Sequence, residues 1–290
     1  MDKTGPIRST EVRLTVLVDN RADPPLTAEH GLSILIETDP VRILFDTGQG
    51  PALPENCRAL GIDLSGLDAV VLSHGHYDHT GGLPYALSQA DTARLFCHPG
   101  VMIDRYAIKP GEAARAIHMP AVSRRAVEQL DPDRISWVTG PVEICSGIHL
   151  TGPIPRRTAY EDTGGAFFLD PQGFRPDPIE DDQALWIETH DGLVVVLGCA
   201  HAGVVNTLER ITELTGRKEV LAVIGGMHLG QAPTGRLEAT VDALRACHPD
   251  VLAPCHCTGE VGTAWMRDHL GPRVRRFSTG LKIVLPRNDI

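Results

Sequence analysis

Residues 70–83 read VVLSHGHYDHTGGL, an apolar run followed at once by three histidines and an aspartate within six positions. In extended backbone, side chains two residues apart point to the same side, so His74 and His76 can converge on one cation. Asp78 and His79 lie on the turn that follows and can face a second cation. Neutral imidazoles gain little from crowding unless something binds them. The segment therefore predicts a site for two divalent ions.

Runs rich in Val, Ile and Leu, each closed by Gly, Pro, Asp or His, predict strands in both halves of the chain. They cover residues 11–20, 32–39, 41–48, 67–74, 93–99, 184–191, 193–201, 219–229, 250–259 and 281–286. Apolar residues at helical spacing predict helices within 201–216 and 234–249. The fold class is mixed α/β.

Two segments of the sequence resemble each other. Residues 34–48 and 185–199 both read as a strand ending in Ile-Glu-Thr, a polar turn, a second apolar strand and a Gly-containing loop. If this repeat is real, it predicts a pseudo-symmetric sandwich whose sheets face each other and whose helices lie outside. A chance match between two common hairpins is the alternative.

Three further histidines, His201, His228 and His256, each follow an apolar strand and sit beside Gly or Cys. Their shared context predicts that they complete the metal site. In the PCHCT stretch, strand alternation would put Cys255 and Cys257 on one face and His256 on the other. We expect His256 to be the ligand and the two cysteines to be packing residues. A zinc-thiolate role for the cysteines is the alternative.

Acidic residues add candidates for support of the site. Asp46, at the end of a strand in LFDTGQG, is expected to hydrogen-bond and orient the histidine segment, with a turn-capping role as the alternative. Asp181 and Asp182 precede the second hairpin. One of them, with Asp182 favoured, could reach the metals; an acidic pair that faces water is the alternative.

The segment from about 84 to about 180 is long for a connection, and such segments usually form lids or substrate loops. Within it, Arg156 and Arg157 offer guanidinium groups for a phosphate or carboxylate, unless they form only a solvated basic turn. An anionic substrate would need such a patch, because the chain carries a formal charge of −10.

The same charge argues against nucleic acid or anionic lipid as a partner. The first twenty residues contain no uninterrupted apolar run, and no stretch approaches a membrane span. The seven cysteines are not spaced like those of a disulfide-bonded framework, which indicates a protein of a reducing compartment. We expect a cytoplasmic protein with a small-molecule substrate, and a homo-oligomer is possible.

The motif SHGHYDHTGGL, with FDTG upstream and strand-end histidines downstream, resembles the metallo-β-lactamase superfamily over nearly the whole chain. The resemblance implies one domain over 1–290 with a four-layered αβ/βα sandwich and a dinuclear metal site at one edge of the sheets. Together with DDQAL, GCAHAGVVNTL, GGMHL and CHCTG, it is similar to the branch of dihydropterin-methyl-ribofuranosylaminobenzene-phosphate synthases and their metal-dependent hydrolase relatives.

The resemblance implies that the family's metal ligands correspond directly to His74, His76, Asp78 and His79 of the motif. His256 matches the last histidine of the family. The family's Gly-Asp segment reads Gly198-Cys199 here, and DDQAL stands where another histidine is usual. The resemblance therefore implies that His201 replaces one standard ligand. Cys199 is a possible ligand or supporting group. His228 has no counterpart and is expected to contact the substrate. The predicted metal ligands are His74, His76, Asp78, His79, His201 and His256.

The resemblance and the predicted site imply a hydrolase that uses metal-activated hydroxide on a small anionic molecule, with Asp78 and His228 as catalytic residues. Asp78 would steer the nucleophile or receive a proton. The first alternative is the pterin-forming transferase of the branch, and the second is an iron-binding redox or sensor protein. Zinc is the expected ion, although imidazole and carboxylate also suit manganese and iron.

Overall fold

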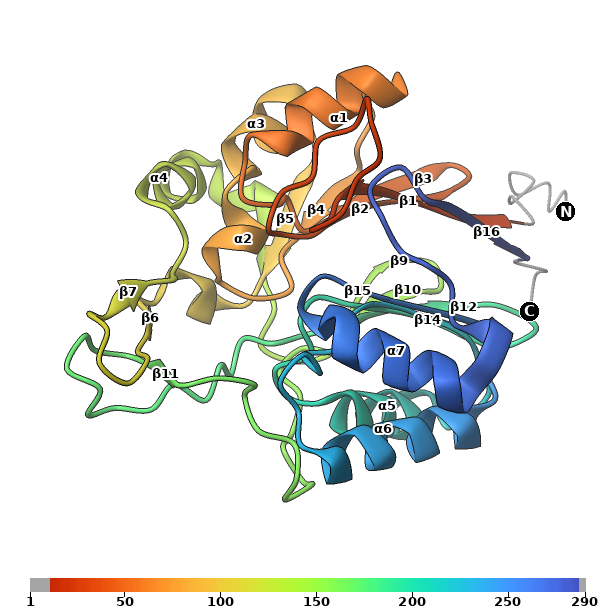
Figure 1. Cartoon of the computed structure of the whole chain (residues 1–290). Coiled ribbons are helices and arrows are strands. Elements are labelled where there is room, and N and C mark those ends of the chain that lie inside the picture. Colours follow the sequence, from red (N-terminus) through yellow and green to blue (C-terminus); the bar gives the residue numbers. More distant parts are fainter. Residues whose placement is uncertain (1–10, 287–290) are drawn as a thin grey trace, which may run out of the picture.

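Two sheets stack face to face between layers of helices in the computed structural model, which describes residues 11–286 (Figure 1). The first sheet consists of β1 (Glu11–Val18), β2 (Ser33–Thr38), β3 (Val41–Phe45), β4 (Ala69–Val71), β5 (Arg94–Cys97), β8 (Ile135–Trp137) and β16 (Lys282–Pro286). Its strand order is β16-β1-β2-β3-β4-β5-β8.

The second sheet consists of β9 (Val142–Cys145), β10 (Ile148–Leu150), β12 (Leu185–Glu188), β13 (Leu193–Leu197), β14 (Val220–Gly226) and β15 (Val251–Cys255). Its strand order is β15-β14-β13-β12-β10-β9. In each sheet an antiparallel hairpin, β2–β3 or β12–β13, leads into parallel strands. These hairpins are the two similar segments of the sequence, so the expected repeat is present in the fold.

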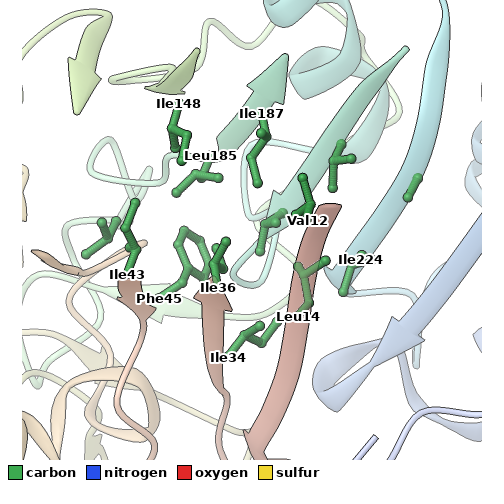
Figure 2. Packing of buried hydrophobic residues seen from close by; sticks show 14 of the residues in the cluster. Val12, Leu14, Ile34, Ile36, Ile43, Phe45, Ile148, Leu185, Ile187 and Ile224 are labelled. Atoms are coloured by element: carbon green, nitrogen blue, oxygen red, sulfur yellow. The ribbon is translucent and has the colours of Figure 1, made fainter. Parts of the chain in front are cut away.

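The core between the sheets is made by side chains that alternate along the strands. On β2, Ile34 and Ile36 face the second sheet, while Leu35 packs on the opposite side against the helices. Figure 2 shows side chains of both sheets packed together between the sheets. Each fully buried aliphatic or aromatic side chain stabilises the fold by about 1.5–3 kcal/mol. Those labelled are Val12, Leu14, Ile34, Ile36, Ile43 and Phe45 from the first sheet and Ile148, Leu185, Ile187 and Ile224 from the second.

Helices cover both outer faces of the sandwich (Figure 1). The first sheet carries α1 (Ala52–Leu60), α3 (Leu83–Gln89) and α4 (Ala121–Gln129), and the second carries α5 (Val204–Thr215), α6 (Thr234–Cys247) and α7 (Gly259–Leu270). Helical spacing in the sequence predicts α5 and α6. No prediction covers α7, whose first four residues include Gly259 and Gly262. The four layers confirm the predicted αβ/βα sandwich.

The segment predicted as an insertion, about 84–180, contains strands of both main sheets and two of the covering helices. Only a small third sheet and its connections are additional to the layers. This sheet has the order β11-β6-β7 and consists of β6 (Tyr106–Ala107), β7 (Arg115–Ala116) and β11 (Phe167–Phe168). It lies beyond one end of the two main sheets (Figure 1). That this sheet acts as a lid stays a prediction.

Short helical turns complete the backbone. A four-residue helix, α2, covers Tyr77–Thr80, and 3₁₀ turns cover Pro99–Met102, Pro132–Arg134, His256–Thr258 and Gly271–Arg273. Within residues 11–286, no helix combines the length and the apolar composition that crossing a bilayer requires.

Replacement of Ile36 by Ala tests the packing of the core. Ile36 is 1% exposed, so the substitution leaves a cavity between the sheets and should lower the free energy of unfolding by about 2–5 kcal/mol. The outward-facing Val284, 51% exposed on β16, is the control, and Val284→Ala should change this free energy by less than about 0.5 kcal/mol. Urea unfolding followed by circular dichroism measures both. Equal effects would contradict the assigned faces.

Candidate metal centre

The candidate ligands gather where strands of the two sheets end. Asp46 follows β3, the segment 74–79 follows β4, Cys199 and His201 follow β13, and His228 and His256 follow β14 and β15. Parallel strands bring their carboxyl ends to one edge of a sheet, and ligand sites of α/β proteins usually lie outside that edge. The two halves of the chain thus place their polar loops opposite each other.

Several loops at this edge hold non-glycine residues in the left-handed region. Asp46, Ala200, His228 and His256 have φ values of 58°, 51°, 48° and 47°. Such a backbone costs about 1–3 kcal/mol at each residue and persists only where the surrounding structure enforces it. The fold therefore stabilises sharp turns next to the candidate ligands.

The first ligand group contains His74, His76 and His201, whose ring nitrogens lie within 4.8 Å of one another. All three side chains are buried, and His74 Nε2 lies 2.9 Å from His76 Nδ1. Among the described residues, His201 Nε2 has no hydrogen-bond partner. Three convergent imidazoles with such a nitrogen among them match the donor set of a divalent transition metal.

Hydrogen bonds to neighbouring groups fix the tautomers of His74 and His201. The Ser73 hydroxyl donates to Asp46 Oδ2 at 2.7 Å, so its oxygen accepts from His74 Nδ1 at 2.9 Å. His201 Nδ1 donates to the carbonyl of Thr163 at 2.7 Å. In both rings the Nε2 atom is then unprotonated and faces the group, as a metal ligand requires.

The second ligand group contains Asp78, His79 and His256. His256 Nε2 lies 3.3 Å from both His79 Nε2 and Asp78 Oδ2. The outer ring nitrogens are again held by acceptors, since His79 Nδ1 bonds Asp46 Oδ2 at 2.7 Å and His256 Nδ1 bonds Asn20 Oδ1 at 2.8 Å. Two inward nitrogens and a carboxylate oxygen therefore converge beside the first group.

Burial controls the protonation of these histidines. It lowers the pKa of His74 and His201 well below the usual value, and neighbouring imidazoles lower it further. These rings are neutral and ready to bind a cation. Burial alone would also lower the pKa of His79, but the Asp46 carboxylate raises it to about 9. A bound ion would take the place of the extra proton on Nε2.

Cys199 lies between the two groups. Its Sγ is 3.1 Å from His79 Nε2, and it shares one candidate ligand set with His74 and His79 and another with His201 and His228. Cys199 therefore carries a thiol at a place from which one ligand could contact ions held by either group.

The expected alternation of Cys255, His256 and Cys257 is wrong, because β15 ends at Cys255 and a 3₁₀ turn begins at His256. Cys255 packs in the core, as expected, but Cys257 lines the cavity beside His228. Burial would raise the pKa of the Cys257 thiol, yet hydrogen bonding to Cys199 and His228 lowers it. A thiolate ligand, the alternative reading of the sequence, is thus compatible with the position of Cys257.

The acidic pair before the second hairpin does not join either group. Asp181 binds both Nη atoms of Arg105, at 2.8 and 2.5 Å, and accepts from the backbone N–H of Gly75 at 2.8 Å. Asp182 accepts from the backbone N–H of Ala202 at 2.7 Å, and burial raises its pKa to about 7. Both carboxylates are buried and support the backbone next to candidate ligands, so the alternative of an acidic pair that faces water is wrong. That Asp182 reaches an ion stays a prediction.

The two predicted substrate arginines also lie elsewhere. Arg156 Nη2 donates to the carbonyls of Pro178 and His201, and Arg157 pairs with Glu213 on α5. Neither lines the cavity beside the ligand groups. Both arginines attach their loop to neighbouring segments. The group of the loop that reaches the ligands is a backbone carbonyl, that of Thr163, which accepts from His201 Nδ1.

A cavity of about 100 Å³ opens beside both groups. His228, the predicted substrate contact, lines it. The sequence analysis did not single out several other lining residues, because four of them lie in loops or on short strands without a motif and Tyr77, within the motif, is not a ligand type. They are His30, Tyr77, Arg115, Ile117 and Phe167. His30 Nε2 is 3.1 Å from Asp78 Oδ2, and Arg115 donates to the Tyr77 hydroxyl at 3.1 Å.

Comparison with known proteins gives matches over most of the chain. A profile of the metallo-β-lactamase superfamily matches residues 26–256. The 7,8-dihydropterin-6-methyl-4-(β-D-ribofuranosyl)-aminobenzene-5'-phosphate synthase of Methanocaldococcus jannaschii is 31% identical over 86% of this chain and 88% of its own length.

Two solved structures extend the comparison. A metal-dependent hydrolase of the β-lactamase superfamily is 31% identical, with a TM-score of 0.81 over 95% of this chain and 99% of that one. Zinc-bound PqqB of Methylobacterium extorquens, at 15% identity and a TM-score of 0.55 over 93% and 99% of the two chains, shares the fold alone.

Replacement of Asp46 by Asn tests how the ligands are oriented. An amide cannot accept hydrogen bonds at both of its ends, and it carries no charge, so His79 should lose its orientation and zinc affinity should fall by about 10- to 100-fold. Competition with a chromophoric chelator measures the affinity. The exposed Asp268 on α7 is the control, and Asp268→Asn should bind zinc like the unchanged protein. Equal affinities of all three proteins would show that Asp46 does not orient the ligands.

Proposed function

Because the chain belongs to the metallo-β-lactamase superfamily, we propose that it is a metal-dependent hydrolase of a small anionic substrate. One observation carries the proposal. Two adjoining groups of buried side chains converge, and protein acceptors hold the outer ring nitrogens of His74, His201, His79 and His256, which leaves Nε2 of each free for an ion.

The donor set suits two ions of borderline softness, and we favour zinc over manganese or iron because thiols accompany the imidazoles. Two such ions would supply hydroxide at neutral pH and stabilise negative charge on the substrate. The chain itself would orient the ligands through Asp46 and exclude water through burial of the groups.

Asp78 is our candidate for receiving a proton at the cavity and passing it on. Burial would raise the pKa of its carboxyl, but hydrogen bonds from His256 and His30 lower it well below the usual value, so the proton would not stay there. Asp78 Oδ2 lies within 3.3 Å of His256 Nε2 and 3.1 Å of His30 Nε2. The imidazole of His30 is half exposed, so a proton taken up at Asp78 can pass through this ring to solvent. His30 is thus a further candidate for proton transfer in the proposed reaction.

The mouth of the cavity favours a substrate with a ring and a negative charge. Phe167 and Tyr77 offer aromatic faces, and the guanidinium of Arg115 lies 5.5 Å from the Tyr77 ring centre. An exposed cation at the entrance attracts anions to an otherwise acidic protein.

A second candidate function is a synthase of the kind named for the M. jannaschii relative. The 31% identity over 86% of this chain favours it. The product in that name carries a phosphate, so it belongs to the same class of anionic small molecules. The same cavity and cations would serve this reaction.

The decisive experiment compares the metal-loaded protein with its His76→Ala variant on phosphodiester and lactone model substrates. Loss of one ligand should reduce hydrolysis by roughly 100-fold or more, since changes to the partners of ligands alone cost about 10- to 100-fold. A chelator should abolish the activity and added zinc should restore it. His190, exposed in the β12–β13 turn, is the control, and His190→Ala should keep full activity.

Complete absence of hydrolysis with metal bound would contradict the hydrolase. Product formation from a reduced pterin and a phosphorylated ribosyl-aminobenzene under the same conditions would then favour the synthase. Recovery of two irons without hydrolysis would also contradict the proposal, in favour of a redox role.

A further inference from the structure

A buried arginine lies next to the candidate metal centre and has few partners. Arg236, in the first turn of α6, is 1% exposed. Its Nη1 donates to Asp162 Oδ1 at 2.6 Å. Among the described residues, its Nε and Nη2 atoms have no hydrogen-bond partner, and both are buried. A buried guanidinium with unused donors is costly unless an acceptor reaches it.

A second cavity, of about 260 Å³, adjoins this arginine. His228 lines both this cavity and the one beside the ligand groups, so the two are separated by little more than one imidazole. Apart from Ala232, the lining residues are polar or glycine: Asp162, Gly164, Gly165, His228, Gln231 and Arg236. A molecule that spans His228 could contact the metal centre and Arg236 at once.

The loop at 162–165 lines the second cavity and packs against His228. Gly164 lies against His228 and accepts from its Nε2 at 3.1 Å. A Cβ at Gly164 would lie 1.7 Å from His228 Cδ2, and the φ of Gly164 is 82°, so only glycine fits. Glu161 anchors the loop by accepting from the N–H groups of Val205 and Asn206 at the start of α5.

The acceptor that Arg236 has in this structure is exposed. The Asp162 side chain is 70% exposed, whereas that of Arg236 is almost completely buried. The exposed carboxylate keeps much of its hydration, so another anion that enters the cavity can displace it. The N-terminus of α6 adds its positive end at the same place, and it has no side-chain cap.

On the basis of the proposed function, we propose that the Arg236 cavity binds an anionic oxygen group of the substrate, a phosphate or a carboxylate. The reacting group then lies in the metal cavity on the other side of His228. When no substrate anion is bound, the Asp162 carboxylate pairs with the Arg236 guanidinium. The anionic group of the substrate displaces this carboxylate when it binds. The planar fork of arginine suits both anions. The substrate is thus a small molecule whose anionic group is separate from the bond that reacts.

Exchange of Asp162 for Asn tests this inference without loss of a buried group. Removal of the competing carboxylate should tighten binding of inorganic phosphate or acetate roughly fivefold, the equivalent of one exposed ion pair. Calorimetric titration of the zinc-loaded protein and of the chelator-treated protein measures the affinity. Because the gain arises at Arg236, it should appear in both. The stronger of the two anions identifies the kind of group bound.

The matched control is Asp242→Asn. Asp242 is 72% exposed, like Asp162, and pairs with the half-exposed Arg245 on the same helix, so the change removes the same charge from an equally exposed carboxylate away from the cavity. This variant should bind both anions like the unchanged protein. The double variant Asp162→Asn/Arg236→Gln should lose the gain. If the double variant does not fold, the comparison of the two single variants decides.

Equal anion affinities of Asp162→Asn and Asp242→Asn would overturn the inference, as would a gain that persists in the folded double variant. Failure of the proposed function is separate. A gain in anion binding at Arg236 without any hydrolysis would support the anion subsite and contradict the hydrolase. Hydrolysis without such a gain would support the hydrolase and contradict the anion subsite.

Discussion

The candidate centre depends on one buried carboxylate, that of Asp46. Its Oδ1 accepts from the Ser73 backbone N–H at 2.7 Å, and its Oδ2 accepts from the Ser73 hydroxyl and from His79 Nδ1, each at 2.7 Å. Ser73 in turn accepts from His74. One side chain therefore orients a histidine in each ligand group. Gly198 permits this packing, because a Cβ there would lie 2.1 Å from Ser73 Oγ.

The two halves of the chain contribute differently to the site. The first half supplies a compact motif after β4, in which four candidate ligands lie within six residues. The second half supplies single residues after successive strands, held on turns with left-handed backbone at Ala200, His228 and His256. Supporting bonds cross between the halves, as when Asn20 orients His256 and Asp181 holds the backbone of Gly75. Face-to-face packing of the sheets is what brings these distant segments within hydrogen-bond reach.

The loop that carries Arg156 and Arg157 is predicted correctly as a segment near the site, but the groups predicted to act there are wrong. Its basic and glycine-rich sequence indicated a substrate loop, and part of it does border both cavities. The arginines do not line either cavity, since Arg157 pairs with Glu213 and Arg156 donates to backbone carbonyls, that of His201 among them. The carbonyls of Thr163 and Gly164 contact the histidines instead. Arg236, in contrast, stands in an ordinary helical pattern, and only its burial distinguishes it.

The sequence by itself determined the layers and the edge at which polar residues gather, because strand alternation, helical spacing and strand-end histidines are local patterns that the backbone must obey. The dense motif at 74–79 also identified four of the candidate ligands from the sequence alone. Only the tertiary structure decided how His201 and His256 divide between the two groups, where Cys257 points and which arginine meets a cavity. These outcomes depend on how two sheets, joined by loops with unusual backbone, settle against each other, and contacts between residues far apart in the chain leave no periodic signal in the sequence.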